Sequence, residues 1–122
     1  MQLNITPAEN QGVAVLGLGG RIVAGDEVDA LRGRIRDLLA SDRKRIVLDM
    51  GGVTRIDSTG IGMLVESVIY TAKQGGELKL VNLPRLVANI LATHRLLQAF
   101  DIYTSTDDAI ASFKKQAKEP AA

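Results

Sequence analysis

Residues 45–76 read RIVLDMGGVTRIDSTGIGMLVESVIYTAKQGG, and this stretch is the strongest indicator of the fold. Arg45–Met50 is a short apolar run, which is the pattern of a central strand covered on both faces. From Ile61 to Ala72, apolar residues recur at the spacing of an amphipathic helix, and we expect this stripe to face inward: Ile61, Leu64, Val65, Val68, Ile69 and Ala72. We expect Gly51-Gly52 to end the strand and Gly75-Gly76 to end the helix. The stretch therefore predicts a buried strand, a loop and a helix.

Outside this stretch, alternating and helical spacings of apolar residues predict the remaining elements. We expect strands at Gln2–Thr6, Val13–Leu16, Glu77–Asn82 and Phe100–Tyr103. We expect helices that contain the apolar stripes within Val28–Leu39 and Val87–Leu91, and a last helix capped by Ser105 or Thr106 with Ile110 and Phe113 turned inward. The turn at Asn10-Gln11-Gly12 predicts that the first two strands are antiparallel, and Asp26 is the expected N-cap of the first helix. Strands that alternate with helices favour a parallel sheet. The predicted fold class is α/β, in the order β-β-α-β-α-β-α-β-α, with a mixed, mostly parallel five-stranded sheet and an antiparallel edge strand.

Length and hydropathy indicate one globular domain. The chain has 122 residues, of which 46% are hydrophobic and 24% charged. We expect the domain to span residues 1–117 and a flexible tail to occupy residues 118–122. The longest mostly apolar segment, Ile61–Ala72, contains Glu66 and is shorter than the roughly 20 residues of a membrane span. With no targeting pattern at the N-terminus, the sequence predicts a cytoplasmic protein that makes no membrane contact.

Composition excludes several kinds of chemistry. The chain has no Cys and one His, which excludes disulfides, thiol nucleophiles and thiolate zinc sites, and we expect no metal. Neither a Gly-x-Gly-x-x-Gly nor a Gly-Lys-Ser/Thr motif is present, so we expect no nucleotide cofactor. Fifteen Lys and Arg against 14 Asp and Glu leave a net charge of +1, and Asp29 and Asp37 dilute the arginines at 32, 34 and 36. We therefore predict no direct DNA binding.

The residues Asp57-Ser58-Thr59-Gly60-Ile61-Gly62 stand where the clearest helix is expected to begin. A hydroxyl at this point faces unpaired backbone N–H groups and the positive end of the helix dipole, which favours a phosphate there. Glycines at 60 and 62 would let another protein approach closely. Spacing alone equally allows Asp57 or Ser58 to be no more than a helix cap.

This segment, with the Ile-Val-Leu-Asp strand at 46–49 and the Val-x-x-Ile approach at 53–56, resembles the phosphorylation motif of STAS domains. These domains are the anti-sigma factor antagonists and their relatives. The resemblance covers almost the whole chain and includes the order of the elements. It extends to Leu16-x-x-Gly19-Gly20, Gly75-Gly76-Glu77-Leu78 and Phe100-x-Ile102.

The resemblance implies that Ser58 is phosphorylated by a partner anti-sigma factor that is itself a serine kinase. The partner-binding residues that it implies are Asp57, Ser58, Thr59, Gly60 and Gly62. It also implies that the unphosphorylated protein captures the anti-sigma factor and frees the sigma factor, and that a serine phosphatase resets the phosphorylated form. One departure is Val23, because soluble antagonists commonly have an acidic residue there.

Two other functions are compatible with the sequence. A scaffold subunit of a sensory, stressosome-like or transport complex would use the same fold with Ser58 as a cap only. A hydrolase would need a base beside Ser58, but His94 is expected at a helix end as a surface or C-cap residue, and the local motif is not Gly-x-Ser-x-Gly. The Asp57-Ser58 pair at a helix start favours the switch, so we predict a binding protein that is not an enzyme and has no cofactor.

Overall fold

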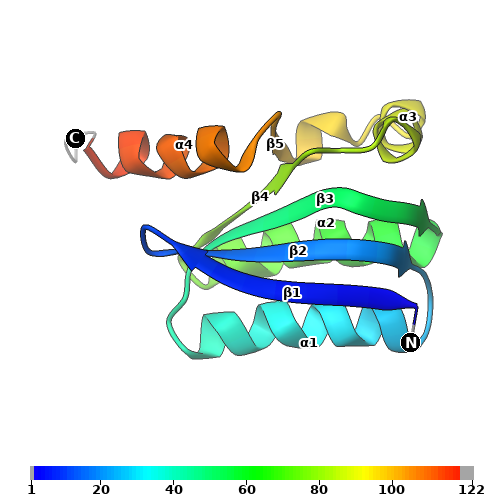
Figure 1. The fold of residues 1–122 in the computed structure, drawn as a ribbon, viewed down its shortest axis with the longest axis horizontal. Helices are drawn as coiled ribbons and strands as arrows, with labels where there is room; N and C mark the ends of the chain where they lie inside the picture. Colours follow the sequence, from blue (N-terminus) through cyan, green and yellow to red (C-terminus); the bar gives the residue numbers. More distant parts are fainter. Residues whose placement is uncertain (1, 119–122) are drawn as a thin grey trace.

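The computed structural model describes the backbone of residues 2–118 and the side chains of residues 2–113 (Figure 1). Its elements are β1 (Leu3–Asn10), β2 (Val13–Ile22), α1 (Asp26–Ala40), β3 (Arg45–Ile56), α2 (Ser58–Lys73), β4 (Glu77–Val81), α3 (Arg85–Thr93), the short 3-10 helix η1 (Leu97–Ala99), β5 (Asp101–Tyr103) and α4 (Thr106–Lys118). The order of strands and α-helices is the predicted one. Among the described residues, no helix is long and apolar enough to cross a bilayer.

The five strands form one sheet in the order β1-β2-β3-β4-β5. As predicted, β1 is antiparallel to β2, while β2, β3, β4 and β5 run parallel to one another. The carboxyl ends of the parallel strands lie together at one end of the sheet, which is where open α/β sheets usually place their sites. In Figure 1 the starts of α1 and α2 lie at this end of the sheet together with α3, and the β1–β2 turn lies at the opposite end.

Strand β3 is longer than predicted, and the expected break at Gly51-Gly52 is wrong. The strand continues through both glycines to Ile56, so α2 follows it after a single residue. The reason is backbone packing, because a Cβ added at Gly52 would lie 2.7 Å from the Leu18 carbonyl oxygen. The register between β2 and β3 shifts in the same region, as at a β-bulge. Gly51-Gly52 therefore lets β2 and β3 stay paired through this region, and does not end β3.

Two apolar cores hold the layers together. The larger core lies between the sheet and helices α1, α2 and α3, and includes Leu48 and Leu64, which expose no surface. The smaller core lies on the other face, where Ile110 and Phe113 of α4 pack with Val47. Both cores are mainly aliphatic, as expected for a chain with two Phe, two Tyr and no Trp.

One charged side chain is buried in the smaller core. Lys79 of β4 exposes no surface, and its Nζ donates a hydrogen bond to Ser112 Oγ at 2.7 Å. The ammonium also lies 3.4 Å from Glu77 Oε2 and 4.4 Å from the centroid of the Phe113 ring. A buried charge needs such partners to offset its lost hydration. Lys79 therefore ties α4 to the sheet.

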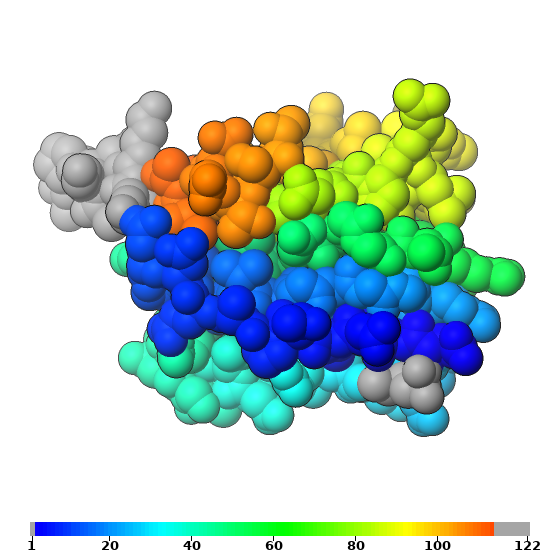
Figure 2. Space-filling view, viewed as in Figure 1, coloured from blue at the N-terminus to red at the C-terminus, as the bar shows by residue number. Residues whose placement is uncertain are grey.

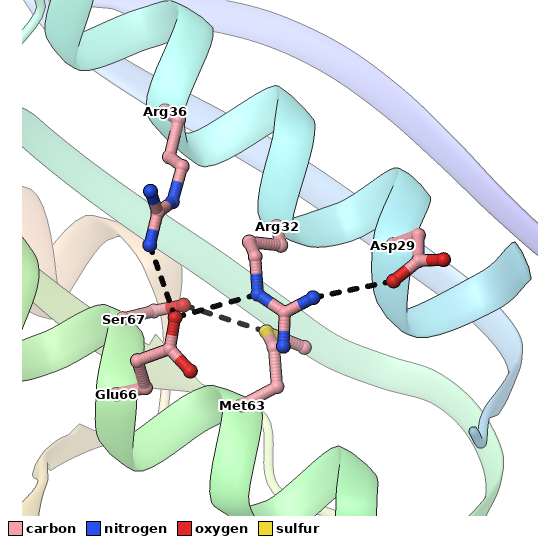
Figure 3. A network of polar contacts seen from close by, with 6 residues as sticks. All are labelled: Asp29, Arg32, Arg36, Met63, Glu66 and Ser67. Atoms are coloured by element: carbon pink, nitrogen blue, oxygen red, sulfur yellow. Dashed lines mark hydrogen bonds and ion pairs between the residues drawn. The ribbon is translucent and has the colours of Figure 1, made fainter. Parts of the chain in front are cut away.

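The predicted inward face of α2 is partly wrong. The apolar stripe included Ile69, yet 51% of this residue is exposed. The helix instead turns Ser67 and Thr71 toward the sheet, and Ser67 Oγ donates to the sulfur of Met63 at 3.4 Å (Figure 3). Because α2 is apolar on more than one side, periodicity alone could not identify the side that packs. An apolar surface of α2 is consequently left outside the core.

Ion pairs join α1 to α2 at the surface (Figure 3). Glu66 Oε1 lies 3.4 Å from Arg32 Nε and 3.1 Å from Arg36 Nη2. Arg32 also pairs with Asp29 at 3.2 Å, and the Arg36 guanidinium stacks 4.3 Å from the centroid of the Tyr70 ring. Exposed pairs of this kind each contribute about 0–1 kcal/mol. Their main consequence here is that these two arginines are engaged within the protein and do not form a free basic patch.

The helix ends match the sequence in part. Asp26 is not the N-cap of α1, because Gly25 holds that position with a φ of 106° and Asp26 is the first helical residue. Of the two predicted caps of α4, Ser105 or Thr106, it is Ser105 that caps the helix, with its Oγ accepting from the Asp108 N–H at 3.1 Å. Residues 119–122 of the expected tail lie outside the described residues, and α4 extends to Lys118.

Replacing Leu64 with Ala should lower the free energy of unfolding by about 2–5 kcal/mol, because it opens a cavity in the larger core. Urea titration followed by circular dichroism measures this change. Ile69→Ala is the matched control on the same helix, and should change stability by less than about 0.5 kcal/mol because that side chain is exposed. A loss below about 1 kcal/mol for Leu64→Ala would show that the core does not depend on α2 in this way.

Candidate functional site

Asp57 joins the start of α2 to the end of β2 through both of its carboxylate oxygens. Oδ1 accepts the N-cap hydrogen bond from the Gly60 N–H at 2.8 Å, and Oδ2 accepts one from the Ala24 N–H at 2.9 Å. The Ala24 bond first, and then the Gly60 bond, lower the pKa of the Asp57 carboxyl from its ordinary value of 3.8. Asp57 is therefore ionised at neutral pH, and its charge is used within the protein.

Because Asp57 is the cap, the Ser58 hydroxyl is not needed for that purpose. Ser58 and Thr59 are the first two residues of α2, and both are exposed. The Ser58 hydroxyl makes no hydrogen bond with any described residue. The first turn of a helix presents unpaired N–H groups and a positive dipole end, which favour a negative group. A phosphate on Ser58 would lie in this field without displacing an existing bond.

The two glycines of the motif have different surroundings. Gly60 is buried, and a Cβ added there would lie 2.3 Å from the Ile22 carbonyl oxygen and 2.9 Å from Ile56 Cγ1. Gly62 is exposed, and a Cβ added there would meet nothing within 4 Å. Gly60 thus allows α2 to approach β2 closely, and Gly62 leaves the outer side of the helix uncovered.

A groove of about 600 Å³ opens beside Ser58 between α2 and α3. It is lined by Ile56, Asp57, Ser58, Ile61, Gly62, Val65, Ile90, His94 and Leu96. We call it the Ser58 groove. Of the predicted partner-binding residues, Asp57, Ser58 and Gly62 line it, whereas Thr59 and Gly60 do not.

A second groove, of about 400 Å³, continues along α2. Gly62 and Val65 line both grooves, and Ile69 lines the second. The further residues that line it are Glu66, Tyr70 and Lys73. We call the two grooves together the α2 surface. A large exposed apolar side chain in a continuous apolar depression is typical of a protein-binding surface.

His94 also lines the Ser58 groove, which the sequence did not indicate. It is the exposed C-cap residue of α3, as predicted. No hydrogen bond joins it to Ser58 among the described residues, and backbone N–H groups use both Asp57 oxygens. A Ser-His-Asp relay is therefore not assembled there. Only the packing of α3 beside α2 brings His94 to this groove, and no local sequence pattern encodes that packing.

Comparisons with known proteins agree with this fold. The family model described as the STAS domain matches residues 4–109. A Thermotoga maritima protein assigned as an anti-sigma factor antagonist has a TM-score of 0.82 at 20% identity, covering 90% of this chain and 94% of that chain. An anti-sigma factor antagonist from Mycobacterium paratuberculosis has a TM-score of 0.78 at 21% identity, covering 92% and 94%. The chain belongs to the STAS domain family.

The Bacillus cell fate determinant SpoIIAA, solved in its phosphorylated form, is also similar. Its TM-score is 0.69 at 15% identity, with coverage of 90% of this chain and 99% of that chain. At these levels of identity the likeness establishes a shared fold. The predicted fold, a mixed five-stranded sheet with one antiparallel edge strand, is confirmed.

The hydrogen bonds to Asp57 predict a pH-dependent contribution to stability. Its pKa is lower in the folded state, so the contribution is fully present above the unfolded value near 3.8 and is lost as the pH falls through the folded pKa. Asp57→Asn keeps a capping oxygen but removes the charge, so it should be less stable than wild type at pH 7. The difference should narrow below pH 3.8. Urea unfolding of wild type and Asp57→Asn, from pH 7 to below pH 3.8, measures this difference in stability. A difference that does not change with pH would contradict the lowered pKa of Asp57.

Alanine at the two glycines of the motif should have opposite effects. Gly60→Ala forces a Cβ against the Ile22 carbonyl, and should lower stability by about 1–3 kcal/mol or more. Gly62→Ala meets no neighbour and should raise stability by up to about 1 kcal/mol through helix propensity. Thermal unfolding of the two variants tests the close contact at Gly60. Equal destabilisation by both substitutions would contradict that contact.

Proposed function

We propose that this protein is an anti-sigma factor antagonist whose binding is switched off by phosphorylation of Ser58. The position of Ser58 carries the proposal, because it is exposed, has no hydrogen-bond partner among the described residues and lines an apolar groove. The unphosphorylated protein binds an anti-sigma factor that is also a serine kinase, and this releases the sigma factor. The names of two structural neighbours support the role, and a third was solved in a phosphorylated form.

The α2 surface is the proposed contact for the anti-sigma factor. It combines apolar side chains such as Val65 and Ile69 with the uncovered backbone at Gly62. An apolar depression flanked by polar residues favours a protein partner, because burial of apolar area supplies the affinity. Ser58 lies within this contact, so the kinase that binds the surface also finds its substrate there.

Phosphorylation acts on this contact through charge. A phosphoserine adds about −1.5 to −2 charges at pH 7, next to the ionised Asp57. Burying that charge in an interface without new cationic partners costs several kcal/mol, and each 1.4 kcal/mol lowers affinity tenfold. In the free protein, the same phosphate lies at a helix N-terminus, where its charge is favoured. The modification therefore weakens binding without disturbing the fold.

The chemistry of the switch belongs to the partners. The kinase supplies ATP and Mg²⁺, and a serine phosphatase removes the phosphate. The antagonist itself is not an enzyme and has no cofactor, and the exchange takes place in the cytoplasm without membrane contact or direct DNA binding. Phosphate is expected on Ser58 rather than Thr59, because Ser58 lines the groove and Thr59 does not.

Mapping the phosphorylation site tests the proposal. The cognate kinase, recovered by pull-down with the wild-type protein, is incubated with ATP, Mg²⁺ and each variant, and the products are analysed by mass spectrometry. Wild type and the matched control Thr59→Ala should accept one phosphate at Ser58, and Ser58→Ala should accept none. Because Asp57 is the cap, Ser58→Ala should also melt close to wild type and bind the kinase constitutively.

Phosphate on a different residue, or undiminished phosphorylation of Ser58→Ala, would refute the switch. A folded protein that captures no kinase and instead copurifies with a sensory or transport assembly would favour the scaffold function.

A further inference from the structure

A second surface lies on the face of the sheet opposite the Ser58 groove. Helix α4 covers this face only where the smaller core lies, around Val13, Val47 and Val81. Figure 2 shows β1, β2 and β3, coloured from dark blue to green, crossing the middle of the molecule with no helix over them. The bare area forms a trough of about 430 Å³. Its lining residues include Asn4, Thr6, Gly19, Asp49, Gly52 and Asn82.

Two arginines stand side by side at the carboxyl end of these strands. Arg21 of β2 and Arg55 of β3 are partners in register, which places their Cα atoms about 4.8 Å apart. The next residues, Ile22 and Ile56, are buried in the larger core. The register between β2 and β3 shifts just before this pair, between Gly20 and Arg21, so the alternation of side chains is counted from Ile22 and Ile56 and places the arginines on the bare face. They lie beyond the lining of the trough, further along the strands than Gly19 and Gly52.

Neither arginine side chain has an ion pair or hydrogen bond within the described part of the chain. Arg21 Nε is buried and has no acceptor there. Asp57, the acidic residue nearest in sequence to Arg55, uses both oxygens on backbone N–H groups, and Val23 supplies no carboxylate. Like charges on neighbouring strands repel each other, and a buried donor without an acceptor is unfavourable. An anion between the two guanidinium groups would reduce the repulsion between them and supply an acceptor for the buried donor.

We infer that the trough and the arginine pair bind an extended acidic segment of a partner protein, with one carboxylate held between Arg21 and Arg55. Carboxylates fit this pair because a guanidinium donates in a planar fork. The glycines of the floor carry no side chains, so the backbone of the segment can lie close to the sheet.

The other end of the trough favours a peptide over a phosphate polymer. Asp49 Oδ1 accepts hydrogen bonds from the Gly51 N–H at 3.0 Å and from Asn82 Nδ2 at 3.2 Å, which leaves a carboxylate facing the trough. A nucleic acid carries negative charge along its whole length and would be repelled by Asp49. A peptide can place a carboxylate at the arginines and an amide N–H near Asp49.

The test is an NMR titration of ¹⁵N-labelled full-length protein with a capped hexapeptide that contains one Glu and otherwise Gly, so that a single carboxylate is offered to the arginines and none to Asp49. Saturable shifts should centre on the amides of Gly19, Gly52 and Arg55 and should weaken as NaCl is added. The double variant Arg21→Gln/Arg55→Gln should lose at least about tenfold in affinity. Arg34→Gln/Arg45→Gln removes the same charge from two exposed arginines outside the trough and should stay within about twofold of wild type.

Arg55→Gln alone is a second variant, which keeps the test informative if the double variant misfolds. It replaces an exposed side chain and should weaken binding by at least about threefold. Absence of saturable shifts, equal binding of the same peptide with Gln in place of Glu, or unchanged affinity in the arginine variants would overturn the inference. Tighter binding of inorganic phosphate or a single-stranded DNA decamer at the arginines would also overturn it. The probe involves neither the kinase nor Ser58, so failure here is distinct from failure of the proposed switch.

Discussion

The site depends on the two hydrogen bonds that the Asp57 carboxylate accepts. This carboxylate lies between the end of β3 and the start of α2, and its two oxygens bind N–H groups from two separate segments, at Ala24 and Gly60. One bond caps α2, and the other holds that helix to the connection between β2 and α1. A neutral side chain would hold the same donors less strongly, because charged acceptors make stronger hydrogen bonds. The Ser58 hydroxyl is left available for the phosphorylation that we propose, because Asp57 already caps the helix.

A steric constraint acts together with this bond. Gly60 lies so close to the Ile22 carbonyl that any side chain would push α2 away from β2. The first turn of α2 is therefore fixed by a hydrogen-bonded cap and by backbone packing at once. In our proposal, a phosphate on Ser58 would therefore change the charge of the α2 surface without moving the helix. The switch that we propose thus resides in the interface rather than in a conformational change.

The sequence predicted the fold well where the signal was local. The apolar run around Leu48, the helical spacing through Leu64 and the turn before Val13 each specified an element without reference to the rest of the chain. The Asp57-Ser58 pair was likewise placed correctly at the start of α2.

Features that depend on contacts between distant segments were not predictable. Gly52 looked like a strand break, because its role appears only when the Leu18 carbonyl is seen against it. Ile69 looked like a core residue, because α2 is apolar on two sides and the spacing does not say which side meets the sheet. His94 entered the Ser58 groove through the packing of α3. Ile69, whose exposure the periodicity did not predict, is one of the apolar residues that line the α2 surface.

The most direct test of the central claim is isothermal titration calorimetry of the cognate anti-sigma kinase, without ATP, against the unphosphorylated and the Ser58-phosphorylated protein. If phosphate acts by placing charge in the α2 surface, the phosphorylated form should bind at least about tenfold more weakly, which corresponds to about 1.4 kcal/mol. Equal affinity of the two forms would show that Ser58 lies outside the contact, and would contradict the switch.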